Sequence, residues 1–171
     1  MKGKLIMNGM EYEVEIVEES AKKFEVKLEK NKTGYERVKY DQVFYYDACD
    51  GESGADYDQE GDGEIDKMYN AANYYSDEKV AAQNARADKL MRQLRRFSVN
   101  SRKTALDWAD SNQDKYFIEF DHDEREFNVD SFACSREFGG IYFDSEEAAW
   151  SAITTFHDEL WWYFIEYKDS L

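Results

Sequence analysis

Two similar stretches of sequence set the expected fold: NYYSDEKVA at residues 73–81 and IYFDSEEAA at residues 141–149. Aromatic residues, a polar residue that can cap a helix, Glu and Ala recur in register at an offset of 68. Each stretch predicts a short strand followed by a capped helix, because a side-chain oxygen satisfies the free N–H groups of a first helical turn. The candidate caps are Ser76 or Asp77 in the first stretch and Asp144 or Ser145 in the second.

Matching strands precede both stretches. The aromatic segments are QVFYYD at residues 42–47 and KYFIEFD at residues 115–121, and residues 126–130 supply a middle strand to the second copy. The helices are expected at residues 77–97 and 145–161. Each copy therefore predicts a β-β-β-α unit of about 70 residues, whose core is marginal on its own, so we expect the two units to pack together.

Three further segments complete the prediction. Residues 4–7 and 11–17 flank Asn8-Gly9, a preferred two-residue turn, and predict an N-terminal β-hairpin. A short helix is expected at residues 104–110. The apolar segment 160–165 either closes the core as a strand or forms a contact patch.

The predicted fold is therefore α+β: an N-terminal β-hairpin and two repeated β-β-β-α units, packed as one compact globule with antiparallel sheets. Residues 1–32 form the hairpin segment. Residues 33–103 form the first unit, with an acidic loop at 47–66 and a basic helix. Residues 104–171 form the second unit, with an aromatic C-terminus.

Composition excludes several classes of protein. The chain has 171 residues, a net charge of −16 and no apolar run near the ~20 residues that a membrane helix needs. The N-terminus lacks the apolar core of a signal peptide, so we expect a cytoplasmic protein without a membrane partner. Cys49 and Cys134 are too few for a disulfide framework or a zinc site, and we expect both to be buried or half-buried.

Charge is distributed unevenly along the chain. Residues 40–66 carry 10 acidic and no basic groups, and residues 110–171 carry 16 acidic and 4 basic groups. Residues 67–109 carry 9 basic and 4 acidic groups. A protein that binds nucleic-acid phosphates in general would need the opposite net charge.

The basic groups of the central helix form one dense stretch: Arg86, Lys89, Arg92, Arg95, Arg96, Arg102 and Lys103. This stretch is either a solvated face that neutralises the protein's own acidic regions or a contact surface for nucleic acid or an acidic partner.

Part of the acidic loop resembles a calcium-binding loop. Asp58, Glu60 and Asp62, followed by Gly63, occupy the alternating positions of an EF-hand, but Tyr69 stands where a bidentate Glu is required. Calcium binding is therefore the weaker interpretation of this loop. The alternatives are a solvated connection between two strands and an acidic patch that faces a partner. We expect no other cofactor.

No catalytic constellation is evident in the sequence. His122 and His157 are far apart, no matched nucleophile accompanies them, and no phosphate-binding glycine loop is present. We therefore predict that the protein is not an enzyme.

The chain resembles a group of uncharacterised small proteins encoded by phages and prophages of Gram-positive bacteria. The resemblance covers about residues 33–160 and rests on these segments: TGYERV at 33–38, YY at 45–46, ANYYSDEK at 72–79, DW at 107–108, NQ at 112–113, KYFI at 115–118 and GIYFDSEEA at 140–148. These motifs are structural, so the resemblance implies a mobile-element origin and carries no catalytic residue. The acidic loop is longer and more charged than is typical of the group.

Together these observations predict an anti-CRISPR-like inhibitor of a host defence system. It would act in the host cytoplasm by binding a nucleic-acid-processing nuclease through carboxylates that replace phosphates. Nucleic acid would not bind this protein and would only compete with it for the nuclease. The expected contact residues are Asp56, Asp58, Glu60, Asp62, Glu64, Asp66, Asp121, Asp123 and Glu124. The alternatives are a phage accessory or regulatory protein without mimicry, and a calcium-binding module at residues 58–69.

Overall fold

The chain has an α+β fold, in which short antiparallel strands alternate with four helices in the part that the structure describes. The structure is a computed structural model, and it describes residues 2–7, 10–18, 24–29 and 32–169. In chain order the elements are β1 (Lys2–Met7), β2 (Met10–Glu18), β3 (Phe24–Glu29), β4 (Val43–Asp47), β5 (Ser53–Tyr57), α1 (Gly63–Asn70), α2 (Glu78–Ser101), β6 (Lys115–Asp121), β7 (Glu126–Phe132), α3 (Glu146–Thr155) and α4 (His157–Ile165).

The first three strands form an antiparallel sheet in the order β1-β2-β3. Its register pairs Leu5 with Tyr12 and Val14 with Leu28. The turn predicted at Asn8-Gly9 lies outside the described residues.

Two further sheets have two strands each, β4 with β5 and β6 with β7, and they remain separate among the described strands. The third strand predicted for each unit is reduced to a single bridge. Tyr45 and Tyr75 exchange backbone hydrogen bonds of 2.9 and 2.8 Å, and Tyr116 and Phe143 exchange bonds of 3.0 and 2.8 Å. These bridges tie each sheet to the chain just before a helix.

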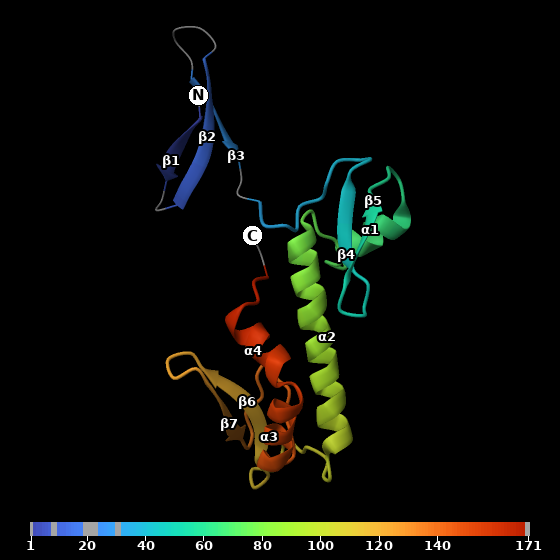
Figure 1. The fold of residues 1–171 in the computed structure, drawn as a ribbon, viewed down its shortest axis with the longest axis vertical. Helices are drawn as coiled ribbons and strands as arrows, with labels where there is room; N and C mark the ends of the chain where they lie inside the picture. The colour runs from blue at the N-terminus through green and yellow to red at the C-terminus, as the bar shows by residue number, and fades with distance from the viewer. Residues whose placement is uncertain (1, 8–9, 19–23, 30–31, 170–171) are drawn as a thin grey trace.

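Helix α2 lies between the two small sheets and packs against both units (Figure 1). Of the two candidate caps, Ser76 and Asp77, the cap is Asp77, whose carboxylate accepts hydrogen bonds from the N–H groups of Lys79 and Val80. The helix is longer than the predicted 77–97. Its buried residues contact the first unit at Val80 and Ala81, and the main core at Leu90 and Leu94.

The second predicted helix, residues 145–161, is two helices joined at Phe156, and the expectation of a strand at 160–165 is wrong. Ser145 is the cap, accepting from the N–H of Ala148. The hydroxyls of Thr154 and Thr155 donate to the carbonyls four residues earlier, at 3.0 and 2.7 Å. Such bonds bend helices, which accounts for the break between α3 and α4.

The short helix expected at 104–110 is a turn. Asp107 accepts the N–H of Ala109 at 2.9 Å, and the amide of Gln113 bonds both the N–H of Asp107 and the carbonyl of Ala105. These side chains satisfy the backbone groups that a helix would have paired.

The main hydrophobic core lies between α2, α3, α4 and the β6–β7 sheet. It contains Leu90, Leu94, Phe143, Ala149, Ala152, Ile153 and Leu160. Two smaller clusters hold the first unit, one around Phe44, Ile65 and Tyr74 and one around Tyr75, Val80 and Ala81.

The close approach of residue 34 to α2 gives a test of this packing. Gly34 has a φ of +93°, and a Cβ there would lie 2.7 Å from Cγ2 of Val80. Gly34→Ala should lower the free energy of unfolding by about 2–4 kcal/mol, from backbone strain plus overpacking. Urea denaturation measures the loss.

Gly61 and Gly63 serve as controls that separate the effect of backbone strain from that of overpacking. Gly61 has a φ of +78° with open space around it, so Gly61→Ala should cost only about 1 kcal/mol. Gly63 also has open space and no positive φ, so Gly63→Ala should change stability by less than about 0.5 kcal/mol. Equal losses at all three positions would contradict the packing of residue 34 on α2.

Candidate functional site

The acidic segment 47–66 is not the loop that the sequence predicts. Residues 53–57 form β5, which pairs with β4, and α1 begins at Gly63. Ser-Gly-Ala-Asp-Tyr has little intrinsic preference for a strand, so pairing with the aromatic strand β4 determines its conformation. The carboxylates of this segment are consequently held in different environments.

Asp58 is fully buried and belongs to a hydrogen-bonded network. Nε and Nη2 of Arg37 donate to its two oxygens at 2.9 and 3.1 Å, and the hydroxyl of Tyr74 donates at 2.7 Å. Nη1 of Arg37 also reaches Asp66 at 2.6 Å. Asp58 and Asp66 therefore anchor residues 33–40 to the end of β5 and to α1, and Asp58 presents no charge to a partner.

This network shifts the titration of its members. The hydrogen bonds from the Arg37 guanidinium lower the pKa of Asp58 below its usual range. Burial raises the pKa of Tyr74 to about 12, and its hydrogen bond to Asp58 contributes in the same direction. The group is therefore an ion pair between a fully buried carboxylate and a half-buried guanidinium, and its tyrosine stays protonated at neutral pH.

The other predicted residues of this segment have mixed roles. Asp62 is the N-cap of α1 and accepts from the N–H groups of Glu64 and Ile65. Glu64 pairs with Lys67 at 2.5 Å on the helix surface. Asp56 and Glu60 are exposed, and neither makes an ion pair within the described residues. The structure thus leaves Asp56, Glu60 and Glu64 on the surface.

The geometry of residues 58–69 does not support the calcium site that the sequence suggests there. Both oxygens of Asp58 are bound to Arg37, and Asp62 caps a helix. Within the described ranges no group of three or more His, Cys, Asp or Glu side chains could hold a metal ion.

The second predicted cluster is on the surface. Asp121, Asp123 and Glu124 are exposed at the turn between β6 and β7, and Asp121 accepts the N–H groups of the other two at 2.8 and 3.0 Å. These backbone hydrogen bonds lower the pKa of Asp121. The turn therefore holds its three carboxylates in an ordered arrangement on the surface.

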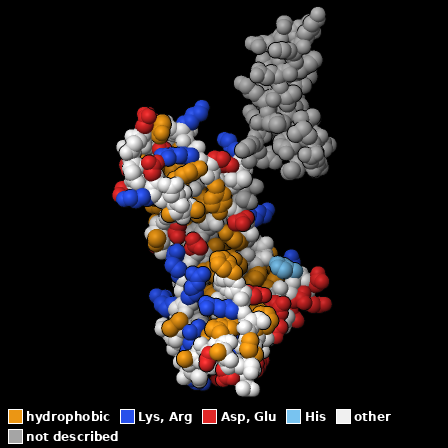
Figure 2. All heavy atoms as spheres, turned by 180° about the vertical axis from the view of Figure 1, so that it is seen from behind, with side chains coloured by type: hydrophobic (Ala, Val, Ile, Leu, Met, Phe, Trp, Pro, Cys, Tyr) orange, Lys and Arg blue, Asp and Glu red, His pale blue; other side chains and the backbone are white. Residues whose placement is uncertain are grey.

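The strand register adds three carboxylates that the sequence prediction missed. Glu119, Glu126 and Asp130 are exposed on the side of the hairpin that also carries Asp121. Alternation along two strands that were predicted correctly was sufficient to find them. We call Glu119, Asp121, Asp123, Glu124, Glu126 and Asp130 the acidic hairpin. Figure 2 shows Asp and Glu side chains gathered where this hairpin projects from the molecule, beside a histidine.

Two of these carboxylates repel each other, which lowers the stability of the sheet. Asp121 and Glu126 are directly opposite each other in the antiparallel register. Like charges at opposed positions destabilise a sheet. Arg125 is the one basic residue between positions 119 and 130, and it has a left-handed backbone with a φ of 57°.

The basic stretch on α2 mostly contacts the protein itself. Arg86 pairs with Glu159 at 2.8 Å and lies 4.0 Å from the ring centroid of Trp162. Arg92 reaches Asp47 at 3.3 Å and also the carbonyl of Cys49. These contacts favour the neutralising role over a nucleic-acid surface.

Several other residues can now be placed. Cys49 and Cys134 are both exposed, so the expectation of buried or half-buried cysteines is wrong. Leu160 and Trp162 are buried, so the apolar segment 160–165 packs against the core and is not an exposed contact patch. Lys115 was not expected to be buried, yet it is fully enclosed, and its ammonium donates to the carbonyls of Asp110 and Ala133 at 2.9 and 2.6 Å.

Comparisons with known proteins gave no relative. No family model matches the chain, and neither the curated proteins nor the solved structures include a match. None of the described helices is long and apolar enough to cross a bilayer.

Acid titration tests the buried pair. Asp58→Asn should lower the free energy of unfolding at pH 7 by about 3 kcal/mol, because it removes the charge-assisted hydrogen bonds that Arg37 makes to a fully buried carboxylate. The folded pKa of Asp58 lies below its unfolded value near 3.9, so its stabilisation is complete above that value. It should disappear as pH falls through the folded pKa.

The control is Asp56→Asn, two residues away and exposed, which should change stability by less than about 0.5 kcal/mol at any pH. Urea denaturation from pH 7 to about pH 2 measures both variants. A gap between wild type and Asp58→Asn that stays constant down to low pH would contradict the ion pair.

Proposed function

We propose that this protein is a phage-encoded, non-enzymatic inhibitor that acts in the host cytoplasm against a defence nuclease. The acidic hairpin would occupy a groove that the nuclease uses for nucleic acid, with carboxylates in place of phosphates. The proposal rests on one observation, a projecting hairpin with six exposed carboxylates. Two of these carboxylates are directly opposite each other, and their repulsion lowers the stability of the sheet.

Electrostatics supports this choice of surface. The basic residues of a nucleic-acid groove create a positive field, and a protein of net charge −16 is attracted into it. Individual exposed ion pairs contribute only about 0–1 kcal/mol, so the affinity would come from the whole set.

The first acidic segment has a smaller part in the proposal than the sequence suggested. Asp58, Asp62 and Asp66 are engaged inside the protein. Asp56, Glu60 and Glu64 are exposed and serve as a comparison set.

We also infer that the two units are copies of one ancestral β-β-β-α element. Supporting this, the aromatic bridges Tyr45–Tyr75 and Tyr116–Phe143 occur at corresponding places. Side-chain caps at Asp77 and Ser145 follow them at equal distances in sequence. In each copy the third strand would have shortened to one bridge.

Charge-matched variants test the inhibitory function. The hairpin variant carries Glu119→Gln, Glu124→Gln and Glu126→Gln, and it leaves Asp121 in place because that carboxylate orders the turn. The control carries Asp56→Asn, Glu60→Gln and Glu64→Gln. Both remove three negative charges. The hairpin variant should bind the partner more weakly and with less salt dependence, whereas the control should bind like wild type.

The partner is first captured from a Gram-positive host lysate with wild-type protein, and then purified as a nuclease. Its affinity for each variant is measured at several salt concentrations, with its own DNA or RNA as competitor. Equal binding by both variants, or binding that nucleic acid does not displace, would contradict mimicry. The accessory role without mimicry would then account better for the acidity.

The opposed carboxylates give a separate test that needs no partner. Glu126→Gln removes the repulsion across the hairpin from Asp121, so it should raise the free energy of unfolding by roughly 0.2–1 kcal/mol. Glu124→Gln, in the turn and not opposed to an acid, is the control. A loss of stability in Glu126→Gln would show that the opposed charges carry no cost.

A further inference from the structure

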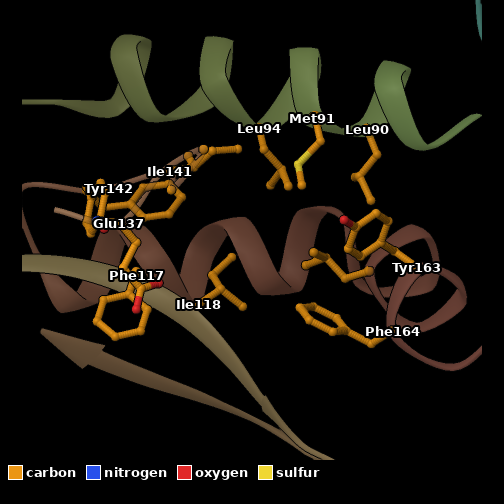
Figure 3. A pocket seen from close by; sticks show the side chains of 14 residues that line it. Leu90, Met91, Leu94, Phe117, Ile118, Glu137, Ile141, Tyr142, Tyr163 and Phe164 are labelled. Atoms are coloured by element: carbon orange, nitrogen blue, oxygen red, sulfur yellow. Dashed lines mark hydrogen bonds between the residues drawn. The ribbon is translucent and has the colours of Figure 1, made fainter. Parts of the chain in front are cut away.

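An apolar pocket of about 170 Å³ lies between helix α2 and the second unit. It is bounded by α2, α4, β6 and the segment that follows β7, and Figure 3 shows side chains from these elements converging on it. Its walls are mainly aliphatic and aromatic, and include Leu90, Leu94, Ile118, Phe143, Leu160 and Phe164. Apolar cavities of about 150 Å³ stay dry and accept a molecule the size of benzene. The pocket is therefore large enough for one aromatic ring.

The two ends of this pocket differ in chemistry. At one end Figure 3 shows the ring of Tyr163 projecting from α4, with its hydroxyl directed toward the interior of the pocket. At the other end lie Glu137, Phe117 and Tyr142, as the same view shows.

The Glu137 end has the features of a cation site. Glu137 lines the pocket and is exposed to solvent, so its carboxylate is at the rim. The rings of Phe117 and Tyr142 stand 6.0 Å apart and pack on Phe132 and Trp108, respectively. The Tyr142 hydroxyl accepts the backbone N–H of Glu137 at 2.8 Å, which fixes residue 137 at this end of the pocket. A carboxylate at the rim attracts an ammonium group.

We propose that this pocket binds a small aromatic amine, with the ring between α2, α4 and β6 and the ammonium group at Glu137. The apolar walls would contribute affinity for the ring, and the carboxylate would select a cation over an anion. The strongly negative charge of the chain acts in the same direction. This inference is independent of the proposed inhibitory function.

A second copy of the chain is the competing occupant. Phe138 is fully exposed on the segment that forms the rim, and its ring is about the size that the pocket accepts. Insertion of Phe138 from another copy would, however, bring together two chains that each carry a charge of −16. Such repulsion disfavours self-association, and so the amine is the favoured occupant.

Three probes of similar size test the proposal on the full chain: phenethylamine, phenethyl alcohol and phenylacetate. Calorimetry and the shift of Tm should both show binding of the amine. The expected Kd of the amine is about fivefold lower than that of the alcohol, which corresponds to one exposed ion pair. Phenylacetate should bind most weakly.

Two variants identify the site. Glu137→Gln should raise the Kd of the amine about fivefold, to the level of the alcohol, and leave the alcohol unchanged. Glu124→Gln makes the same charge change away from the pocket and should leave the amine's Kd unaltered. Met91 lines the pocket and is only half-buried, so Met91→Trp should fill the space and abolish binding of both probes.

Several outcomes would overturn the proposal. Wild-type protein that binds none of the probes, or that binds amine and carboxylate equally, has no amine site. Binding that survives in a folded Met91→Trp protein lies elsewhere. Should Met91→Trp fail to fold, Glu137→Gln decides, because its side chain is exposed. A dimer in size-exclusion chromatography that Phe138→Ala dissociates would assign the pocket to a second copy.

Discussion

Neither two-stranded sheet of this protein can stand alone, and helix α2 supplies what both of them lack. An isolated two-stranded hairpin is at best marginally stable in water, because it buries too little apolar surface. Val80 and Ala81 near the start of α2 are buried with the first unit, and Leu90 and Leu94 further along belong to the core of the second. Arg92 and Arg86 reinforce these two contacts through Asp47 and Glu159. The bridges before α2 and α3 then fix how each sheet meets its helix.

The two units use charge differently, and this difference is what leaves one surface acidic. In the first unit Arg37 pairs with Asp58, which is fully buried, and with Asp66, which is half-exposed. In the second unit Lys115 is fully buried and bonds two carbonyl groups, so it offers no counterion to the hairpin. The start of β6 is therefore enclosed, while its far end carries carboxylates into solvent.

Much of this arrangement could be predicted from the sequence, and the errors have identifiable causes. The aromatic strands, the two caps and the α+β class follow from alternation and from capping residues, which are local signals. The fate of Asp58 could not be predicted, because its partner Arg37 lies 21 residues earlier in a segment without periodicity. The strand β5 is equally non-local, since its sequence is extended only against β4. The bend at Phe156 depends on hydroxyl groups that can either face solvent or bond the backbone, and the sequence does not distinguish the two.

The acidic hairpin and the apolar pocket share strand β6, yet they depend on different physics. Glu119 is exposed beside Ile118, which lines the pocket, because neighbouring residues of a strand face opposite ways. The hairpin depends on charge and hence on ionic strength, whereas the pocket depends mainly on buried apolar area, which salt affects little. Substitutions at Glu119 or Glu126 change the first property without touching the walls of the second. The two proposals can therefore succeed or fail independently.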